Sequence, residues 1–134
     1  MITNASLAAW LLRMTLGSVM LAHSLYLKFW VFTLAGTAEF FVSLGLPPIL
    51  AYLVFFIEAI AGLALLLGFH SQKAALALIP ILFGATWAHW QSGWLFTNEG
   101  GGWEYPMVLT LMAFIQSLLG DGKWALAKEV DDVQ

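Results

Sequence analysis

Residues 48–68 read PILAYLVFFIEAIAGLALLLG, and this stretch decides which kind of fold the chain adopts. A helix needs about 20 apolar residues, at 1.5 Å of rise each, to cross roughly 30 Å of hydrocarbon, and the stretch is long enough. Its one charged residue, Glu58, lies near its middle. Because such a charge is costly in lipid, the stretch predicts a membrane-spanning helix whose carboxylate has a definite task.

The rest of the chain has the same character. Of its 134 residues, 10% are charged and 61% are hydrophobic, against about 25% charged in a soluble domain. We therefore predict an all-α fold, a transmembrane four-helix bundle that forms a single integral membrane domain surrounded by lipid. The expected segments are spans at about 5–27, 48–68, 73–93 and 105–120, a short amphipathic interfacial helix at about 37–45, and a charged tail at 121–134.

Composition and charge exclude several classes of function. The chain has no cysteine, which excludes disulfides, CxxC redox chemistry and thiolate metal sites within it. The formal net charge of -3, with no basic patch, argues against a nucleic-acid partner. Lys73, Lys123 and Lys128 fall on one side of the predicted spans and Lys28 alone on the other. The positive-inside rule then places both termini in the cytoplasm.

Two ionisable residues, Arg13 and Glu58, fall well inside predicted spans. Their Cα depths differ by very roughly 5 Å along the membrane normal, which an arginine side chain can cover. We therefore predict an ion pair between them. In one interpretation the pair is structural and sets the register of two helices. In the other, Glu58 carries a proton or contacts a ligand while Arg13 holds it in place.

A second set of polar side chains falls near the outer ends of the spans. The residues expected at this level are His23, Lys28, His89, Glu104 and Tyr105, with Glu39 nearby. A shared pocket open to the outer side explains them best, since isolated polar groups are expensive in lipid. Such a pocket suits a quinone head group or another small polar molecule. There are three alternatives: a His/His/carboxylate metal site, axial ligation of a haem by the two histidines, and plain packing. Because the chain has no HxxxH or HExxH spacing, we expect no metal.

Many of these residues occur in an order and spacing typical of a known family. They are Arg13 to Gly17, His23 to Lys28, FFVSLGLP at 40–47, Glu58 with Gly62 and Gly68, His89, and Glu104-Tyr105-Pro106. Over about residues 10–122 the chain resembles the DoxX family (DoxX/DoxD-like) of small four-helix bacterial membrane proteins. It departs from the common pattern after His23, where Ser24 to Leu27 precede Lys28.

The resemblance implies a multi-pass protein of the bacterial inner membrane. Members are described as the small subunit of thiosulfate:quinone oxidoreductase, as quinol oxidase-like subunits, or as membrane partners in oxidative-stress complexes. The leading hypothesis is therefore an accessory or quinone-interacting subunit of an oxidoreductase, with a redox partner protein and no covalent cofactor. The residues assigned to proton handling are Arg13, Glu58 and His89, and those assigned to ligand binding are His23, Lys28, His89, Glu104 and Tyr105.

Other functions stay open from the sequence. One is a non-enzymatic small-molecule carrier, and another is a membrane assembly or scaffold module; either could act as a homo-oligomer such as a homodimer. A purely structural role for the buried charges is a third. Whether the protein is an enzyme is not decided by its residues.

Overall fold

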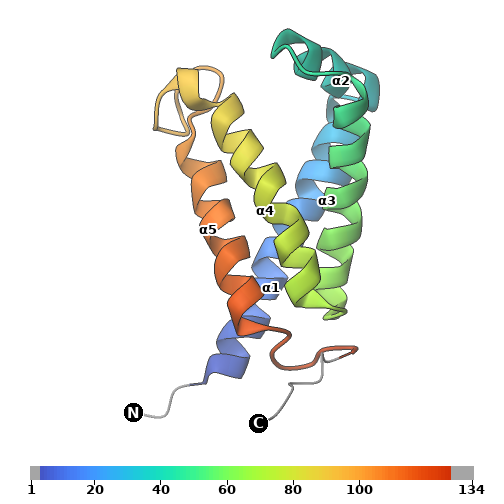
Figure 1. The fold of residues 1–134 in the computed structure, drawn as a ribbon, viewed down its shortest axis with the longest axis vertical. Helices are drawn as coiled ribbons and strands as arrows, with labels where there is room; N and C mark the ends of the chain where they lie inside the picture. Colours follow the sequence, from blue (N-terminus) through green and yellow to red (C-terminus); the bar gives the residue numbers. More distant parts are fainter. Residues whose placement is uncertain (1–3, 128–134) are drawn as a thin grey trace.

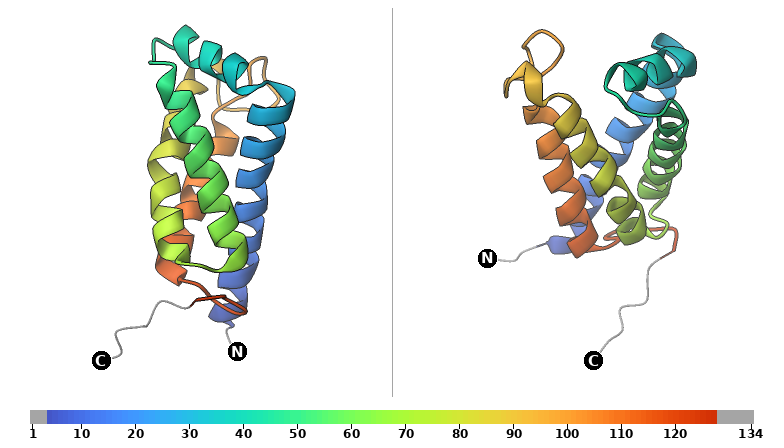
Figure 2. Two further views of the ribbon diagram at one scale, coloured as in Figure 1. Left: turned by 90° about the vertical axis from the view of Figure 1, so that its right-hand side faces the viewer. Right: turned by 45° about the horizontal axis from the view of Figure 1, so that its top comes forward.

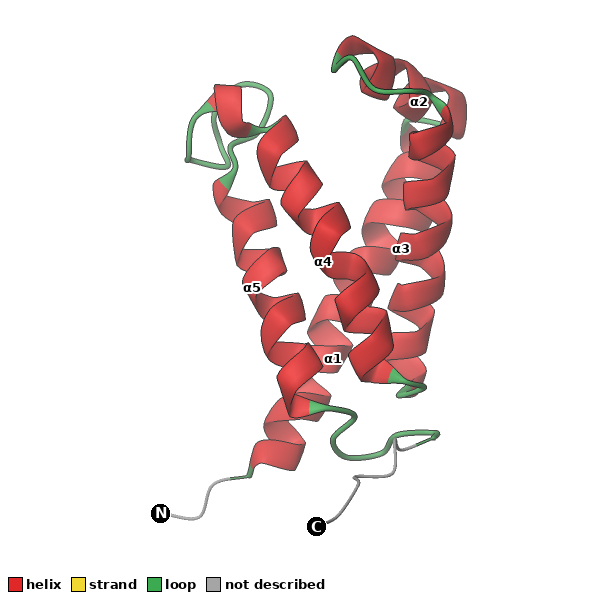
Figure 3. Ribbon diagram, viewed as in Figure 1, coloured by secondary structure: helices red, strands yellow, loops and turns green. Residues whose placement is uncertain are grey.

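The fold is made of helices. The computed structural model describes residues 4–127, and within that range it contains helices and loops, with no strand beyond an isolated parallel bridge between Phe69 and Ala127. The helical segments are α1 (Ala5–Leu21), the π-helical segment η1 (Ala22–Val31) that continues it, α2 (Leu34–Ser43), α3 (Ile49–Leu67), α4 (Ser71–Ala88), the short turn η2 (Trp90–Ser92) and α5 (Glu104–Leu119). Figure 3 shows the helices in red and the loops that connect them in green. The prediction of an all-α protein is confirmed.

Local chemistry explains where several helices begin and end. The side chain of Asn4 accepts a hydrogen bond from the Leu7 N–H at 3.0 Å and so caps α1. Pro48 precedes α3, and Gly68 ends it in the left-handed conformation at φ 68°, which glycine adopts without steric penalty. Glu104 is the first residue of α5, where its negative charge suits the helix dipole.

The long helices contact one another in a ring. α1 packs against α3 and α5, and α4 also packs against α3 and α5. Figures 1 and 2 show that α4 and α5 lean away from α1 and α3 toward the end that carries α2. We name this the open end, and we name the opposite end, where α1 begins and α5 ends, the closed end. α2 lies across the open end against η1 and α3.

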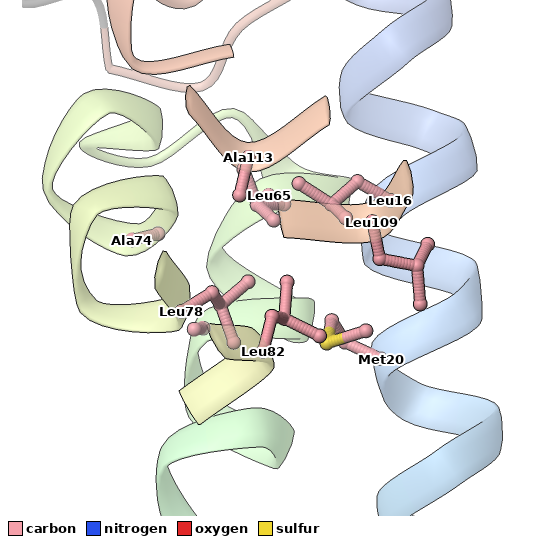
Figure 4. Packing of buried hydrophobic residues seen from close by; sticks show 9 residues of the cluster. Leu16, Met20, Leu65, Ala74, Leu78, Leu82, Leu109 and Ala113 are labelled. Carbon is pink, nitrogen blue, oxygen red and sulfur yellow. The ribbon is translucent and has the colours of Figure 1, made fainter. Parts of the chain in front are cut away.

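An apolar core fills the space between the four long helices in the half of the molecule nearer the closed end. It consists of Leu16, Met20, Ala61, Leu65, Ala74, Leu78, Leu82, Leu109 and Ala113, all buried. Figure 4 shows these side chains converging from α1, α3, α4 and α5. The core therefore joins all four long helices and holds together the half of the molecule in which they have not yet diverged.

Two glycines allow α1 and α3 to approach closely. A Cβ atom added to Gly17 would lie 2.9 Å from the carbonyl oxygen of Gly62, and one added to Gly62 would lie 3.1 Å from the Cβ of Met20. Small residues at such crossings let helices associate by backbone contact where lipid removes the hydrophobic drive. The α1–α3 crossing thus depends on both positions.

A pair of glycine-to-alanine changes tests this crossing. We expect Gly17→Ala to lower the free energy of unfolding by about 1–3 kcal/mol, because the backbone of α3 must move. Gly84→Ala is the matched control, since a Cβ there meets nothing within 4 Å, and it should stabilise the helix by about 0.5–1 kcal/mol. Unfolding of the purified protein in detergent measures both. Equal effects of the two changes would contradict the close crossing.

Some segments differ from the predicted bounds. The first helical segment continues to Val31 rather than ending near 27. Lys28 can lie within it because Glu58 pairs with its ammonium group inside the protein. α2 covers Leu34–Ser43 instead of 37–45, and α4 ends at Ala88 instead of 93. The chain after Ala88 forms η2 and then turns at Gly93, whose φ is 81°.

The first part of the predicted tail packs against the closed end. The N–H of Lys123 donates to the Ser6 carbonyl at 3.0 Å, and the N–H of Leu126 donates to the Leu67 carbonyl at 3.0 Å. Residues 121–127 therefore connect α1 to α3 at the closed end. The remainder, 128–134 with Lys128, lies outside the described residues.

Candidate functional site

A cavity of about 950 Å³ lies between the diverging helices at the open end. Its floor includes Met20, Leu82 and Leu109, which also belong to the apolar core. Its walls come from η1, α2, α3, α4 and α5 and are mostly apolar. The side chains with polar groups among its lining are His23, Lys28, Thr37, Glu58, Trp87, His89 and Tyr105.

An ion pair between Lys28 and Glu58 stands in the wall of this cavity. The Lys28 Nζ donates to the Glu58 Oε2 at 2.7 Å, and the two side chains are 18% and 6% exposed. The predicted ion pair between Arg13 and Glu58 is therefore wrong. Glu58 sits within an apolar helix because a lysine from the first helix compensates its charge.

The π-helical geometry of η1 explains how Lys28 reaches this position. In an α-helix, at 100° per residue, the residue five positions after His23 would point about 140° away from it. A π-helix closes its hydrogen bonds over five residues instead of four, as the Phe32 N–H does to the Leu27 carbonyl at 2.8 Å. The wider turn brings Lys28 back to the face of His23, and both line the cavity. The π-helical turn therefore accommodates the four residues, Ser24 to Leu27, that separate His23 from Lys28.

Arg13 lies at the closed end, away from the cavity lining, and is fully buried. Its Nη1 donates to the carbonyls of Leu65 at 2.8 Å and Leu66 at 3.0 Å. Its Nη2 donates to those of Lys123 at 2.8 Å and Trp124 at 3.3 Å. The last carbonyls of a helix have no partner within it and form the negative end of its dipole. Arg13 therefore caps α3 and holds the chain that follows α5.

Asp121 completes this arrangement at the closed end. Its carboxylate interacts electrostatically with Arg13, and its Oδ1 accepts a hydrogen bond from the Ser71 N–H at 2.9 Å. Ser71 is the first residue of α4, where a carboxylate suits the positive end of the helix dipole. Arg13 and Asp121 thus link α1, α3 and α4 through main-chain groups, which is a structural role.

The two histidines of the cavity each present one ring nitrogen as an acceptor. His23 Nδ1 lies 2.9 Å from the Val19 carbonyl, and His89 Nδ1 lies 3.0 Å from the Gly100 carbonyl. Because a carbonyl oxygen only accepts, Nδ1 carries the proton in both rings and Nε2 is the acceptor of the neutral form. The ring of His23 also stacks on Tyr105, with centroids 6.0 Å apart and planes at 29°.

Glu104 and Glu39 do not join the cavity. The Glu104 Oε2 accepts from the Phe96 N–H at 3.2 Å and so anchors the loop before α5. Glu39 is exposed on α2. Among the described residues, the cavity brings together His23, Lys28, His89 and Tyr105 from the predicted outer level, and it adds Glu58, which the depth estimate had assigned to another partner.

Comparison with known protein families identifies the family of this chain. Residues 8–90 match the model of the DoxX family. The chain belongs to the DoxX family. The matched range runs from α1 into η2, so it contains Lys28, Glu58 and most of the cavity wall. No curated protein and no solved structure matches this DoxX protein.

The helices of this DoxX protein fit the membrane character of the family. Ala5–Val31 and Ile49–Leu67 are long and apolar enough to cross a membrane. Large apolar side chains are also exposed on α4 and α5, such as Phe83 at 62% and Leu118 at 69%. A surface of this kind is stable in lipid rather than water. The DoxX protein is a membrane protein.

The structure adds Thr37 and Gly84 to the lining, which the sequence did not single out. A threonine in a helix and a glycine in an apolar span carry no sequence signal for a site. Among the described residues of this DoxX protein, no three His, Asp or Glu side chains gather where they could hold a metal ion.

Proposed function

We propose that this protein crosses the bacterial inner membrane four times, with the closed end and both termini on the cytoplasmic side. α4 and α5 have 18 and 16 residues, or about 27 and 24 Å of length, close to the roughly 30 Å of a hydrocarbon layer. Lys73 and Lys123 lie at the closed end, which supports this orientation. The stacked pair Trp90–Trp103 at the open end would lie at the outer interface.

We propose further that the cavity binds a quinone, and that the protein is a quinone-interacting subunit of an oxidoreductase system. The observation that carries this proposal is the Lys28–Glu58 ion pair in the wall of a mostly apolar cavity. The volume of about 950 Å³ falls within the roughly 300–1,000 Å³ of small-molecule sites. Because the ion pair carries no net charge, it suits an uncharged head group that can both accept and donate hydrogen bonds.

The side chains of the cavity match the two forms of such a head group. The Lys28 ammonium carries three N–H donors, so it can donate to a carbonyl oxygen while it still pairs with Glu58. The Glu58 carboxylate and the Nε2 atoms of His23 and His89 are acceptors, and they can take a proton from a hydroxyl group. A bound quinone would supply the redox chemistry, with a partner protein as the source of electrons.

Quinone retained by the purified protein tests this function. We expect quinone in solvent extracts of the wild-type protein. We expect about tenfold less in Glu58→Gln, because a hydrogen bond to a charged group contributes about 1.5–3 kcal/mol, and a smaller loss in His89→Ala. Glu99→Gln, in the exposed loop before α5, is the matched control and should retain the wild-type amount. Absence of quinone, together with unchanged membrane electron flow in both cavity variants, would reject the proposal.

An assembly module remains the second candidate, and one observation favours it. A shallow apolar groove on the outside of α3 and α4 has the accessible alanines Ala64 and Ala77 in its lining. Small residues let helices of two copies approach closely in lipid. Crosslinking in native membranes separates the two functions, since a stable homodimer without a redox partner would favour assembly.

A further inference from the structure

Gly84 has no role in the fold that would require a glycine. It lies inside α4, away from any turn. A Cβ added to it would meet nothing within 4 Å, in contrast to Gly17 and Gly62. A glycine in a helix lowers stability by about 0.5–1 kcal/mol relative to alanine. The space beside Gly84 therefore needs an explanation other than packing.

This space belongs to the cavity. Most of the α4 residues that line it are Pro80, Ile81, Gly84, Ala85, Trp87 and Ala88; Leu82, on the other side of the helix, belongs to its floor. At 100° per residue, positions 80, 81, 87 and 88 lie within about 60° of position 84 around the helix. Gly84 is thus at the centre of the face that α4 turns to the cavity, and it makes that face concave.

The opposite wall is an apolar face of α3. Its lining residues Leu50, Leu53, Val54 and Ile57 follow the spacing of one helix face. Leu53 and Trp87, on the two facing helices, are 53% and 55% exposed, so neither side chain is covered by the facing helix. Figure 1 shows α3 and α4 diverging toward this end, while in the closed half they share the apolar core.

The ion pair lies next to this opening. Counted from the short turn between α3 and α4, equal rise along both helices sets Gly84 opposite Val54, about one turn on the open side of Glu58. A molecule with its head group at Lys28 and Glu58 would therefore have the gap beside Gly84 as an apolar route toward the surrounding lipid.

We propose that a hydrocarbon chain attached to the ligand's head group lies between α3 and α4, and that Gly84 is the residue that admits it. This inference rests on the proposed function and narrows its ligand to an uncharged quinone with a long apolar tail that enters sideways from the bilayer. Gly84 contacts the tail and determines specificity, whereas Lys28 and Glu58 bind the head group.

Binding of two matched probes tests the proposal. The probes are a dimethoxy-methyl-benzoquinone that carries a decyl chain and the same ring without the chain. Quenching of tryptophan fluorescence measures both, because Trp87 lines the cavity. The proteins are the purified full chain, Gly84→Leu, Gly84→Phe, and Leu76→Phe as a control that adds bulk to an exposed position of α4 outside the cavity.

We expect Gly84→Phe to raise the Kd of the decyl compound about tenfold or more, with Gly84→Leu in between, because the added side chain displaces the hydrocarbon chain. The compound without a chain should bind within about twofold of wild type, which also shows that the variant is folded. Leu76→Phe should bind both probes as the wild type does.

The other outcomes separate the two proposals. If the wild type binds neither probe, the quinone function is rejected, and this inference with it. If the wild type binds both probes but Gly84→Phe leaves the decyl compound unaffected, the tail passage is rejected and the quinone function stands. Equal weakening of both probes by Gly84→Phe would place Gly84 at the head group and likewise overturn the inference.

Discussion

Replacing Arg13 by methionine should lower the free energy of unfolding by about 3–5 kcal/mol, the loss typical of breaking a buried charged network. Arg13 is fully buried and donates to the carbonyls of Leu65 and Leu66 in α3 and of Lys123 and Trp124 after α5. Methionine fills similar space but removes the guanidinium donors from all four oxygens. It also removes the electrostatic attraction between Arg13 and Asp121.

Thermal unfolding in detergent, followed by circular dichroism, measures this effect. Arg13→Lys is the conservative control and should fall between methionine and wild type, because an ammonium group cannot reproduce the planar fork of a guanidinium group. The charge-reversed double variant, Arg13→Glu with Glu58→Arg, should show no rescue, since Arg13 and Glu58 have separate partners. We name the contacts of Arg13 and Asp121 that link α1, α3, α4 and the chain after α5 the closed-end clamp. Rescue in that variant, or a wild-type midpoint for Arg13→Met, would contradict the closed-end clamp.

The second large effect concerns the Lys28–Glu58 pair. Lys28→Met should destabilise the protein by about 3 kcal/mol, because it leaves a carboxylate uncompensated in an apolar wall. Adding Glu58→Leu should recover most of that loss, since no lone charge remains. Quinone binding, in contrast, should stay at least about tenfold weaker in the double variant, because the head group has lost both partners.

This pair of readouts separates structure from function. The unfolding midpoint in detergent reports stability, and the Kd of the decyl quinone reports binding. A matched double variant on the outer surface, Leu63→Met with Leu111→Met, should change neither, because both side chains are exposed outside the cavity. If the Lys28–Glu58 double variant recovered stability and also bound quinone normally, the ion pair would have a structural role alone.

The ends of α3 and the start of α5 were accessible to sequence analysis, whereas the ends of the first helix and of α4 were not. Pro48 and Gly68 bracket α3 because their backbone preferences are intrinsic to the residues. Glu104 begins α5 for a similarly local reason. These effects act within a few residues, so the sequence alone reveals them.

The partners of the buried charges were not accessible in the same way. Hydropathy gives the depth of Arg13 and Glu58 but not the direction in which each side chain points around its helix. The π-helical segment adds a further rotation that depends on main-chain hydrogen bonds and changes which face carries Lys28. The depth argument therefore selected the wrong cation for Glu58.

The packed segment 121–127 and the open space beside Gly84 were beyond prediction for another reason. Lys123 and Leu126 are held through their N–H groups, which every non-proline residue has, so their composition indicated only a charged tail. The open space beside Gly84 results from how far α3 and α4 diverge, which is a property of the whole assembly rather than of any motif.

The closed-end clamp also orders the events of biogenesis. The Arg13 guanidinium group meets its partners in α3 only when a chain 52 residues longer has been made, and meets the Lys123 carbonyl 110 residues after its own synthesis. At about 5–20 residues per second, the second interval lasts on the order of 5–20 seconds. During that time α1 carries a cation that the membrane disfavours. Lys123 and Trp124, which are made long after α1, thus complete the set of partners of its buried cation.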